Sequence, residues 1–144
     1  MESHQRPFVS TDLSMIDLDV VHRWLSSDAY WALGRTREAV QQAADHSLNF
    51  GVFDGQGALR GYGRAITDYT NVALLDDIYV EPSARGRGYG LLLAQGIVDV
   101  LAPFGLQRIM LATRHAHGLY EKVGFTPLDK PDHWMVLQPP APTA

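Results

Sequence analysis

Apolar residues recur along the chain with a helical period in some stretches and in strand-like runs in others, a mixture typical of an α/β domain. Four helices are expected, at residues 18–25, 37–46, 89–101 and 118–123. Asp17 and Thr36 are suited to cap the first two, because their side-chain oxygens can accept hydrogen bonds from unpaired backbone N–H groups. Pro103 and Gly105 close the third helix, which is long and apolar.

Strand-like runs separated by turn residues predict most of the remaining chain. Six strands are expected, at residues 8–10, 48–53, 59–67, 72–80, 108–112 and 134–137. The second and third form a hairpin, since the turn at residues 54–57 contains two glycines. The strand at residues 72–80 is predicted to be central, and Pro82 ends it. The order is strand, two helices, a three-stranded meander, helix, strand, helix and strand.

Composition constrains the number of domains, the partners and the compartment. With 144 residues, 46% hydrophobic and 19% charged, the chain fits one globular domain, expected over residues 1–138, with a flexible Pro-rich tail at 139–144. A net charge of -4 argues against nucleic acid or anionic lipid as a partner. A membrane span, a secretory signal and cysteine are all absent from the sequence, so a cytoplasmic protein is expected.

Candidate chemistry begins between the central strand and the long apolar helix, where glycines occupy alternate positions. Gly86, Gly88 and Gly90 allow the backbone to curl so that several N–H groups point at one spot, and the helix N-terminus adds its own. With charge from Arg85 or Arg87, such a loop suits a pyrophosphate, although a flexible loop before a helix explains the glycines equally well. The Gly-Lys-Ser/Thr of a P-loop is absent, and a dinucleotide-binding fold would place its glycines in the first βαβ unit.

A second motif follows this loop at a defined distance. Arg85-x-x-Gly88-x-Gly90 precedes a helix, a strand and Leu-Tyr-Glu-Lys-Val-Gly-Phe at residues 119–125, and this arrangement resembles the GNAT superfamily of N-acetyltransferases. The resemblance is close over residues 78–125. It implies a single-domain GNAT-like α/β fold, with a mixed, mostly antiparallel central sheet, helices on both faces and two central strands splayed at the cofactor site.

Members of that family use acetyl-coenzyme A, and the resemblance implies where this co-substrate binds. The pyrophosphate would be held by backbone N–H groups of the glycine loop, namely Arg85, Gly86, Arg87, Gly88, Tyr89 and Gly90. The pantetheine arm would pair with the backbone of Ile78, Tyr79 and Val80, because splayed strands leave backbone polar groups unpaired. Thr113 stands where many members have asparagine, and its hydroxyl can still donate a hydrogen bond.

Tyr120 matches the tyrosine that family members use as a general acid. Coenzyme A leaves as a thiolate when an amine attacks the thioester, and a phenol with a pKa of about 10 can protonate or hydrogen-bond the sulfur. The alternative is that Tyr120 packs through its ring and its hydroxyl has a structural partner. The position in the motif favours the acid.

Asp76 and Asp77 are the candidate catalytic carboxylates, in a segment that resembles the acidic pair of polyamine N-acetyltransferases. An alkylammonium has a pKa near 10.4 and an aspartate near 3.9, so direct proton transfer is uphill by roughly 9 kcal/mol unless desolvation or a water chain intervenes. Neighbours in a strand face opposite sides, so only one aspartate should reach the acceptor unless a bulge is present. Alternatively, both are solvated acids.

Several other polar and aromatic residues have structural or open interpretations. His115 and His117 lack a third ligand at metal spacing, so no metal is expected. Tyr30, Trp31 and Trp134 could line an acceptor pocket or belong to the core.

Together these features predict an N-acetyltransferase that moves acetyl from acetyl-coenzyme A to a primary amine, on a small cationic molecule, by direct attack in a ternary complex. Asp68, Asp76 and Asp77 would favour a cationic acceptor if they faced one cavity. The alternative is a non-catalytic acyl-coenzyme A binding or sensor module on the same fold, which would have no need of an acid at Tyr120. The sequence leaves open whether the protein is a homodimer.

Overall fold

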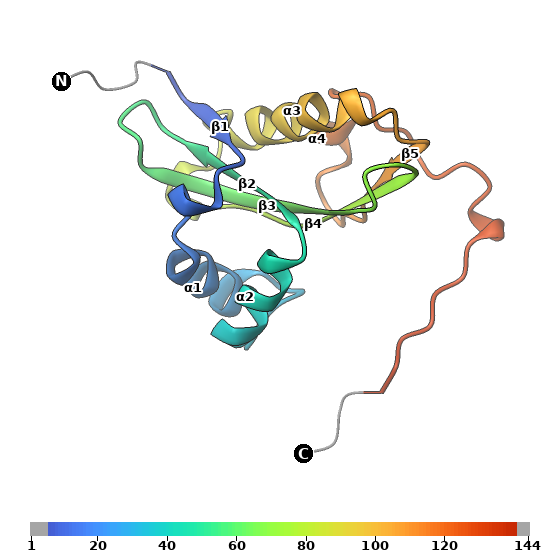
Figure 1. The fold of residues 1–144 in the computed structure, drawn as a ribbon, viewed down its shortest axis with the longest axis horizontal. Helices are drawn as coiled ribbons and strands as arrows, with labels where there is room; N and C mark the ends of the chain where they lie inside the picture. Colours follow the sequence, from blue (N-terminus) through green and yellow to red (C-terminus); the bar gives the residue numbers. More distant parts are fainter. Residues whose placement is uncertain (1–5, 141–144) are drawn as a thin grey trace.

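The fold is a single α/β domain on one five-stranded sheet, described for residues 6–140 by a computed structural model (Figure 1). The strands lie in chain order, as β1 (Phe8–Ser10), β2 (Leu48–Phe53), β3 (Leu59–Thr67), β4 (Val72–Val80) and β5 (Arg108–Met110). Strands β1 to β4 pair antiparallel and β5 pairs parallel to β4, so the predicted mixed sheet is confirmed. Two segments lie outside the described residues. They are residues 1–5, part of the N-terminus in which no secretory signal is expected, and residues 141–144, most of the predicted tail.

Helices begin where local sequence signals predict them. Within the described residues the α-helices are α1 (Leu18–Asp28), α2 (Arg37–Asp45), α3 (Tyr89–Leu101) and α4 (His117–Glu121). Both predicted caps are confirmed: Asp17 accepts the N–H of Asp19 at 3.0 Å, and Thr36 accepts the N–H of Ala39 at 3.0 Å. None of these helices is long and apolar enough to cross a membrane.

The helices cover both faces of the sheet, as predicted (Figure 1). On one face α1 and α2 pack around Val21, Leu25 and Val40. On the other face lies α3, whose Leu93 and Ile97 are completely buried. Burial of these apolar helix stripes against the sheet is the main source of stability for an α/β layer structure of this kind.

Strands β4 and β5 diverge soon after they meet. Their pairing covers three positions, from Val72 opposite Arg108 to Leu74 opposite Met110, whereas β4 continues to Val80. Strand β5 ends at Met110, two residues earlier than expected. Within the described part of the chain, the β5-facing edge of β4 therefore lacks a strand partner beyond Leu74, and the predicted splay of the two central strands is confirmed.

The predicted last strand at residues 134–137 is wrong. The segment has no regular secondary structure, and Met135, Val136 and Leu137 are 98%, 83% and 86% exposed. Trp134 stays beside the sheet, with the Arg108 guanidinium 5.3 Å from its ring centre, and the chain then runs away from the sheet (Figure 1). Apolar, β-forming residues make a strand only where they run alongside a sheet edge, and this segment runs away from the sheet after Trp134.

Candidate active site

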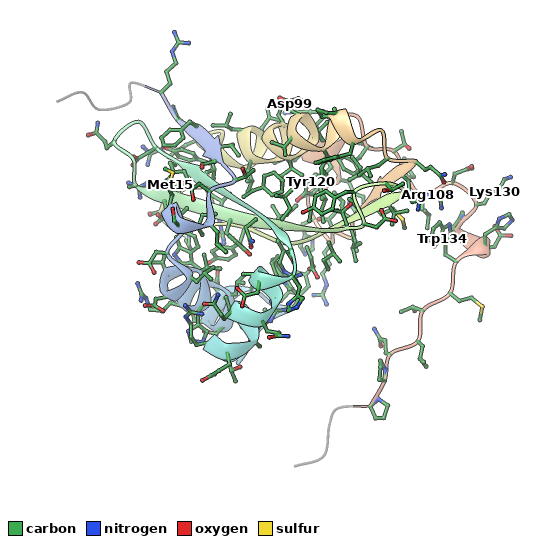
Figure 2. The ribbon with its side chains drawn as sticks, in the orientation of Figure 1. Met15, Asp99, Arg108, Tyr120, Lys130 and Trp134 are labelled. Atoms are coloured by element: carbon green, nitrogen blue, oxygen red, sulfur yellow. The ribbon has the colours of Figure 1, made fainter. Side chains whose placement is uncertain are left out.

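A cavity of about 780 Å³ opens where β4 and β5 diverge. It is lined by the α1–α2 connection at residues 28–31, by β4 residues 75–80, by Arg85, by residues 111–116 after β5, and by Tyr120 of α4. Figure 2 shows Tyr120 inside the body of the molecule, between the sheet and the helices α3 and α4. The structure thus brings together the β4 and tyrosine motifs that the sequence singled out.

The glycine loop leads directly into α3 and leaves donors free. Gly86 and Gly88 have φ of 77° and 90°, left-handed conformations that side chains rarely adopt, and an added Cβ at either would meet nothing within 4 Å. Gly88 is the N-cap of α3 and supplies no side chain to bond the first turn. The N–H groups of Tyr89 and Gly90 therefore have no acceptor among the described residues, as expected for a site that takes an anion.

Gly90 has a structural role that the sequence did not reveal. A Cβ on Gly90 would lie 3.0 Å from Cδ1 of Leu119, in α4. The absence of a side chain at Gly90 therefore allows α4 to pack against the first turn of α3. Because Leu119 precedes Tyr120, this contact also sets where the tyrosine lies.

Arg85 is bound to the protein rather than free in the loop. Its Nε donates to the carbonyl of Val80 at 2.8 Å, and its second nitrogen contacts Asp28 at 3.1 Å. The guanidinium also lies 5.1 Å from the ring centre of Tyr79, whose hydroxyl donates to Asp28 at 2.5 Å. Arg87 is exposed beside the ring of Tyr89, 6.0 Å away. Of the two arginines predicted to add charge to the loop, Arg87 is therefore the one not paired with an acid.

A β-bulge interrupts β4 at the acidic pair. One residue of β3, Gly63, stands opposite both Asp77 and Ile78, and Asp77 has a φ of 54°. The extra residue turns Asp77 to the same side of the sheet as Asp76, so that Arg64 contacts both carboxylates. The condition under which both acids could share a face is therefore met.

Asp77 is 3% exposed, and both of its oxygens are occupied. Trp31 donates to Oδ1 at 2.7 Å, while Arg35 and Arg64 each donate to Oδ2 at 2.7 Å. Burial alone would raise the pKa of Asp77, but the hydrogen bonds from Arg64 and Trp31 and the charges of both arginines outweigh it and lower the pKa. Asp77 is therefore a fixed anion that holds the α1–α2 connection against β4.

Asp76 is the accessible member of the pair. Its side chain is 42% exposed, Oδ1 accepts the N–H of Asp77 at 2.8 Å, and Oδ2 lies 3.3 Å from Arg64. Asp68 is elsewhere, in the β3–β4 turn, where it accepts the N–H groups of Thr70 and Asn71. The condition that all three acids face one cavity is thus not met, because Asp76 and Asp77 line it and Asp68 lies in the turn.

Tyr120 is 8% exposed, and its ring packs edge to face against Phe125 at 5.8 Å. No described residue hydrogen-bonds its hydroxyl, and since no described side-chain polar atom is both fully buried and unbonded, the hydroxyl oxygen is accessible from the cavity. Burial raises the pKa of Tyr120 to about 12, so the hydroxyl stays protonated across the physiological range. The structural partner expected under the packing interpretation is therefore absent from the part of the chain that is described.

The segment between β5 and α4 forms the rest of the wall. Thr113 accepts the N–H of Ala116 at 3.1 Å and so helps to start α4, with its own hydroxyl proton left for donation. His115 lines the cavity, whereas His117 lines a smaller neighbouring one. Over residues 6–140 the structure contains no group of three or more His, Cys, Asp or Glu arranged to hold a metal.

A comparison with known families decides the assignment. The model of the acetyltransferase (GNAT) family matches residues 18–125. The chain belongs to the GNAT family. The match spans α1 to the glycine and phenylalanine after α4, and thus contains every residue of the cavity described above.

Known proteins resemble this GNAT protein over most of its length. A crystal structure from Xanthomonas campestris pv. campestris, described as belonging to the GNAT family, is 42% identical, with a TM-score of 0.86 over 95% of this chain and 96% of that one. A Gibberella zeae protein named as an acetyltransferase is 29% identical, over 79% of this chain and 75% of its own. A Clostridium acetobutylicum structure with acetyl-CoA shares the fold, at 14% identity and a TM-score of 0.66 over 92% of this chain and 95% of that one.

The aromatic residues of this GNAT protein divide between two places. Tyr30 and Trp31 pack edge to face at 4.9 Å and both line the cavity, and Arg114 lies 4.1 Å from the ring centre of Tyr30. Trp134 lies at the outer edge of β5 and lines a different cavity. Of the aromatic residues predicted to border an acceptor pocket, only Tyr30 and Trp31 are therefore placed to do so.

Two arginines of the site were missed by sequence reasoning. Arg35 lies just after the α1–α2 turn and Arg64 on β3, and neither belongs to a motif. Arg64 could have been found by extending the hairpin register, since it pairs with Asp76 across the β3–β4 ladder. No local signal marks Arg35, because its contact with Asp77 depends on how the α1–α2 connection folds over β4.

Proposed function

We propose that this GNAT protein is an N-acetyltransferase, which moves acetyl from acetyl-coenzyme A to a primary amine of a small molecule in a ternary complex. The observation that carries the proposal is the Tyr120 hydroxyl, a protonated donor without a partner among the described residues, on the cavity between the splayed strands. A non-catalytic binding or sensor module would have no need of such a donor. A cytoplasmic location, which the lack of cysteine favours, is part of the proposal.

Acetyl-coenzyme A fits the free polar groups around the cavity. The unpaired N–H groups at the start of α3 suit its pyrophosphate, and the space beside Gly86 and Gly88 permits close approach. The backbone of Ile78 to Val80 suits the pantetheine amides, once the Arg85 side chain leaves the Val80 carbonyl. Distant structures of this fold were solved with acetyl-CoA and with CoA, which supports the same choice here.

The reaction forms one C–N bond and breaks one C–S bond. A neutral amine attacks the thioester carbonyl, the acetyl group passes to nitrogen, and coenzyme A departs as a thiolate. With a pKa of about 12 for Tyr120 and about 8.5 for a thiol, complete proton transfer to the sulfur is uphill by roughly 5 kcal/mol. Tyr120 therefore acts mainly as a hydrogen-bond donor that stabilises the departing sulfur.

The amine must lose a proton, and Asp76 is the residue we assign to assist. Its side chain is 42% exposed and lines the cavity, whereas Asp77 has both oxygens occupied. Asp77 acts through its neighbours: it orients Arg64, which contacts Asp76, and it anchors Trp31. Asp76 receives the proton directly or through water that leads to bulk solvent.

The acceptor is assigned to the end of the cavity beside Tyr30 and Trp31. Three carboxylates and two guanidinium groups line the cavity, and two of the carboxylates are compensated, Asp77 by Arg35 and Arg64 and Asp76 by Arg64. The lining thus has no strong excess of either charge. We therefore propose a primary amine as the acceptor. The acidic residues do not support the expected preference for a cationic molecule, because arginines compensate them.

The test combines co-substrate binding with turnover. Calorimetry should show acetyl-coenzyme A binding by the natural protein, and release of free thiol in a panel of primary amines should reveal acceptors. Gly88→Val should weaken binding more than tenfold, or by at least about 1.4 kcal/mol, because valine distorts the loop that presents its N–H groups.

Gly57→Val is the matched control. Gly57 has a φ of 86°, also with nothing within 4 Å of an added Cβ, but lies in the β2–β3 turn. The two glycines have similar φ values and Gly57 does not line the cavity, so binding should be kept. Unchanged affinity in a folded Gly88→Val variant would contradict the assignment of the loop. If none of the amines in the panel causes release of thiol, only the binding function is left.

A further inference from the structure

One charged side chain that lines the 780 Å³ cavity has no counter-ion. The three carboxylates of the lining all have arginine partners, namely Arg85 for Asp28, Arg64 for Asp76, and Arg35 with Arg64 for Asp77. The remaining guanidinium of the lining, that of Arg114, forms no ion pair or hydrogen bond within residues 6–140. The arginines in and around the cavity therefore outnumber the acids by one, and the unmatched charge is that of Arg114.

Aromatic rings hold Arg114 at one end of the cavity. Its guanidinium carbon lies 4.1 Å from the ring centre of Tyr30, which packs edge to face on Trp31 at 4.9 Å. The indole of Trp31 donates to Asp77 of β4 at 2.7 Å. Arg114 belongs to the segment after β5, so its contact with Tyr30 joins two walls of the cavity at the end assigned to the acceptor.

The guanidinium of Arg114 is suited to bind a carboxylate. It offers only N–H donors, and none of them is used by a residue in the described part of the chain. Two such donors match the two oxygens of a carboxylate, which gives a bidentate, charge-assisted pair. Arg114 is exposed, so a ligand that enters the cavity can reach these donors.

The pyrophosphate of the co-substrate is a second anion, but the glycine loop provides for it. Arg85 is the one residue of that loop that lines the cavity, and Gly86 to Gly90 do not belong to the lining. The N–H groups that suit a pyrophosphate therefore lie outside the cavity wall that carries Arg114. This separation leaves the Arg114 guanidinium for the acceptor.

We infer that Arg114 binds a carboxylate of the acceptor, so that the substrate of this protein is an amino acid, a molecule with both a primary amine and a carboxylate. The inference rests on the proposed function, which supplies the attack of the amine. The ammonium gives its proton to Asp76 or to water, the nitrogen takes the acetyl group as the C–S bond breaks, and the carboxylate at Arg114 is unchanged.

Charge and surface agree with such a molecule. In its reacting form, with a neutral amine and an ionised carboxylate, an amino acid has one negative charge, which matches the unmatched charge of Arg114. Tyr30 and Trp31 are 48% and 39% exposed, so their rings offer apolar surface to the carbon atoms of the acceptor.

The first experiment compares acceptors in matched pairs, by release of free thiol from acetyl-coenzyme A. Each pair is an amino acid and its primary amide, such as leucine and leucinamide, taken through all the amino acids found in proteins. The kcat/KM of the best amino acid should exceed that of its amide by about 10- to 100-fold. The carboxylate raises the pKa of its own amine, so the amide has more neutral amine at neutral pH and the comparison is biased against the inference.

Variants then test whether Arg114 carries this preference. Arg114→Gln should raise the KM of the amino acid by about 10- to 100-fold, with kcat, the kinetics of the amide and the affinity for acetyl-coenzyme A nearly unchanged. Arg114→Lys keeps the charge without the paired donors and should give an intermediate KM.

Arg108→Gln is the matched control. The Arg108 guanidinium also lies against an aromatic ring, that of Trp134 at the outer edge of the sheet, 5.3 Å away (Figure 2). It forms no ion pair with any residue from 6 to 140, and it lines a different cavity. Its loss should leave the kinetics of amino acid and amide unchanged.

The second experiment needs no turnover. Calorimetry measures the binding of N-acetyl amino acids, the expected products, and of their amides, with and without coenzyme A. The N-acetyl amino acid that corresponds to the best ligand should bind at least about tenfold more tightly than its amide. Arg114→Gln should remove this difference, whereas Arg108→Gln should keep it.

The outcomes separate this inference from the proposed function. If no acceptor releases thiol but the carboxylate preference in binding is present and depends on Arg114, the proposed function fails and the anion site stands. If amines without a carboxylate react as well as amino acids, or Arg114→Gln slows amino acid and amide alike, the proposed function stands and the inference is overturned. Absence of both turnover and carboxylate preference would overturn both.

Two further results would assign Arg114 to another anion. The aminophosphonate analogue of the best amino acid is tested beside it, and higher kcat/KM for the analogue would mean that Arg114 recognises a phosphate-like group. A loss of affinity for acetyl-coenzyme A in Arg114→Gln would mean that Arg114 binds the co-substrate. Either result overturns the assignment of an amino acid as the acceptor.

Discussion

On the β4 wall of the cavity, Asp77 has both oxygens occupied by Trp31, Arg35 and Arg64, whereas on the α4 wall the hydroxyl of Tyr120 has no partner among the described residues. Both side chains are largely buried. A buried polar group that is fully bonded stabilises the fold, and an unbonded one that opens on a cavity is available to a ligand. The comparison therefore assigns structure to the first wall and chemistry to the second.

The largest expected effect is on the rate of acetyl transfer, when the unbonded hydroxyl of Tyr120 is removed. Tyr120→Phe should slow single-turnover acetyl transfer by about 10²- to 10⁴-fold, or about 3 to 5 kcal/mol, if its hydroxyl assists the departing sulfur. Affinity for acetyl-coenzyme A should stay nearly the same, because the ring still packs against Phe125. The measurement needs saturating acetyl-coenzyme A and an active acceptor, so that slow product release does not mask the chemical step.

Tyr62→Phe makes the same chemical change at a bonded group and is the control. The Tyr62 hydroxyl is buried and donates to Asn49, so its loss should lower the free energy of unfolding by about 1 to 3 kcal/mol and leave the rate close to that of the natural protein. A fall of less than about fivefold in the Tyr120→Phe rate would be only about 1 kcal/mol, the contribution of an ordinary hydrogen bond, and would remove the catalytic role.

Asp77→Asn should cause the largest loss of stability. Replacing the anion leaves Arg35 and Arg64 facing a neutral amide, and breaking a buried ion pair in this way lowers the free energy of unfolding by about 3 to 5 kcal/mol. Because the folded-state pKa of Asp77 is lowered, its contribution is present above the unfolded value near 3.9 and is lost as pH falls through the folded value. Urea unfolding near neutral pH and at acid pH measures both effects. Equal stability of the variant and the natural protein at neutral pH would show that the Asp77 carboxylate does not stabilise the fold.

Asp76→Asn should change the rate more than the stability. Its side chain is 42% exposed, so the free energy of unfolding should change by less than about 1 kcal/mol. Near neutral pH acetyl transfer should slow by about 10²-fold, and the deficit should shrink toward pH of about 10, where more of the acceptor amine is already neutral. If the pH–rate profile of Asp76→Asn has the same shape as that of the natural protein from neutral to alkaline pH, the amine proton leaves through water alone.

The smallest effect concerns alkaline pH and the burial of Tyr120. The pKa of about 12 lies above the unfolded value of about 10, so burial of the phenol contributes stability that is present below pH 10 and is lost as pH rises toward 12. One pH unit above 10 corresponds to about 1.4 kcal/mol, and Tyr120→Phe should reduce the alkaline loss by about 1 kcal/mol relative to the natural protein. The measurement is the free energy of unfolding of both proteins at about pH 10 and about pH 11. If it falls equally in the two proteins, the hydroxyl is hydrated in the folded state.

Sequence reasoning reached most of the fold and the outline of the site. The strands 48–53, 59–67 and 72–80 have the predicted bounds, and both predicted helix caps form, because these signals act over a few residues. The neutralised acid pair was out of reach, since it needs Arg35 from one connection and Arg64 from another strand. The strand predicted at residues 134–137 was wrong because strand formation needs a neighbouring edge that local pattern cannot supply.

By itself the sequence determined the order of elements from β1 to α4, the glycine loop before α3 and the motif that carries Tyr120, since periodicity, caps and backbone freedom are properties of short segments. Only the tertiary structure decided that a bulge turns Asp76 and Asp77 to one side, that Asp77 is fully bonded and that the Tyr120 hydroxyl has no partner within residues 6–140. These features depend on which groups meet across the sheet. A side chain gains or loses its partners through contacts between residues far apart in the chain, and such contacts exist only after folding has brought the surfaces together.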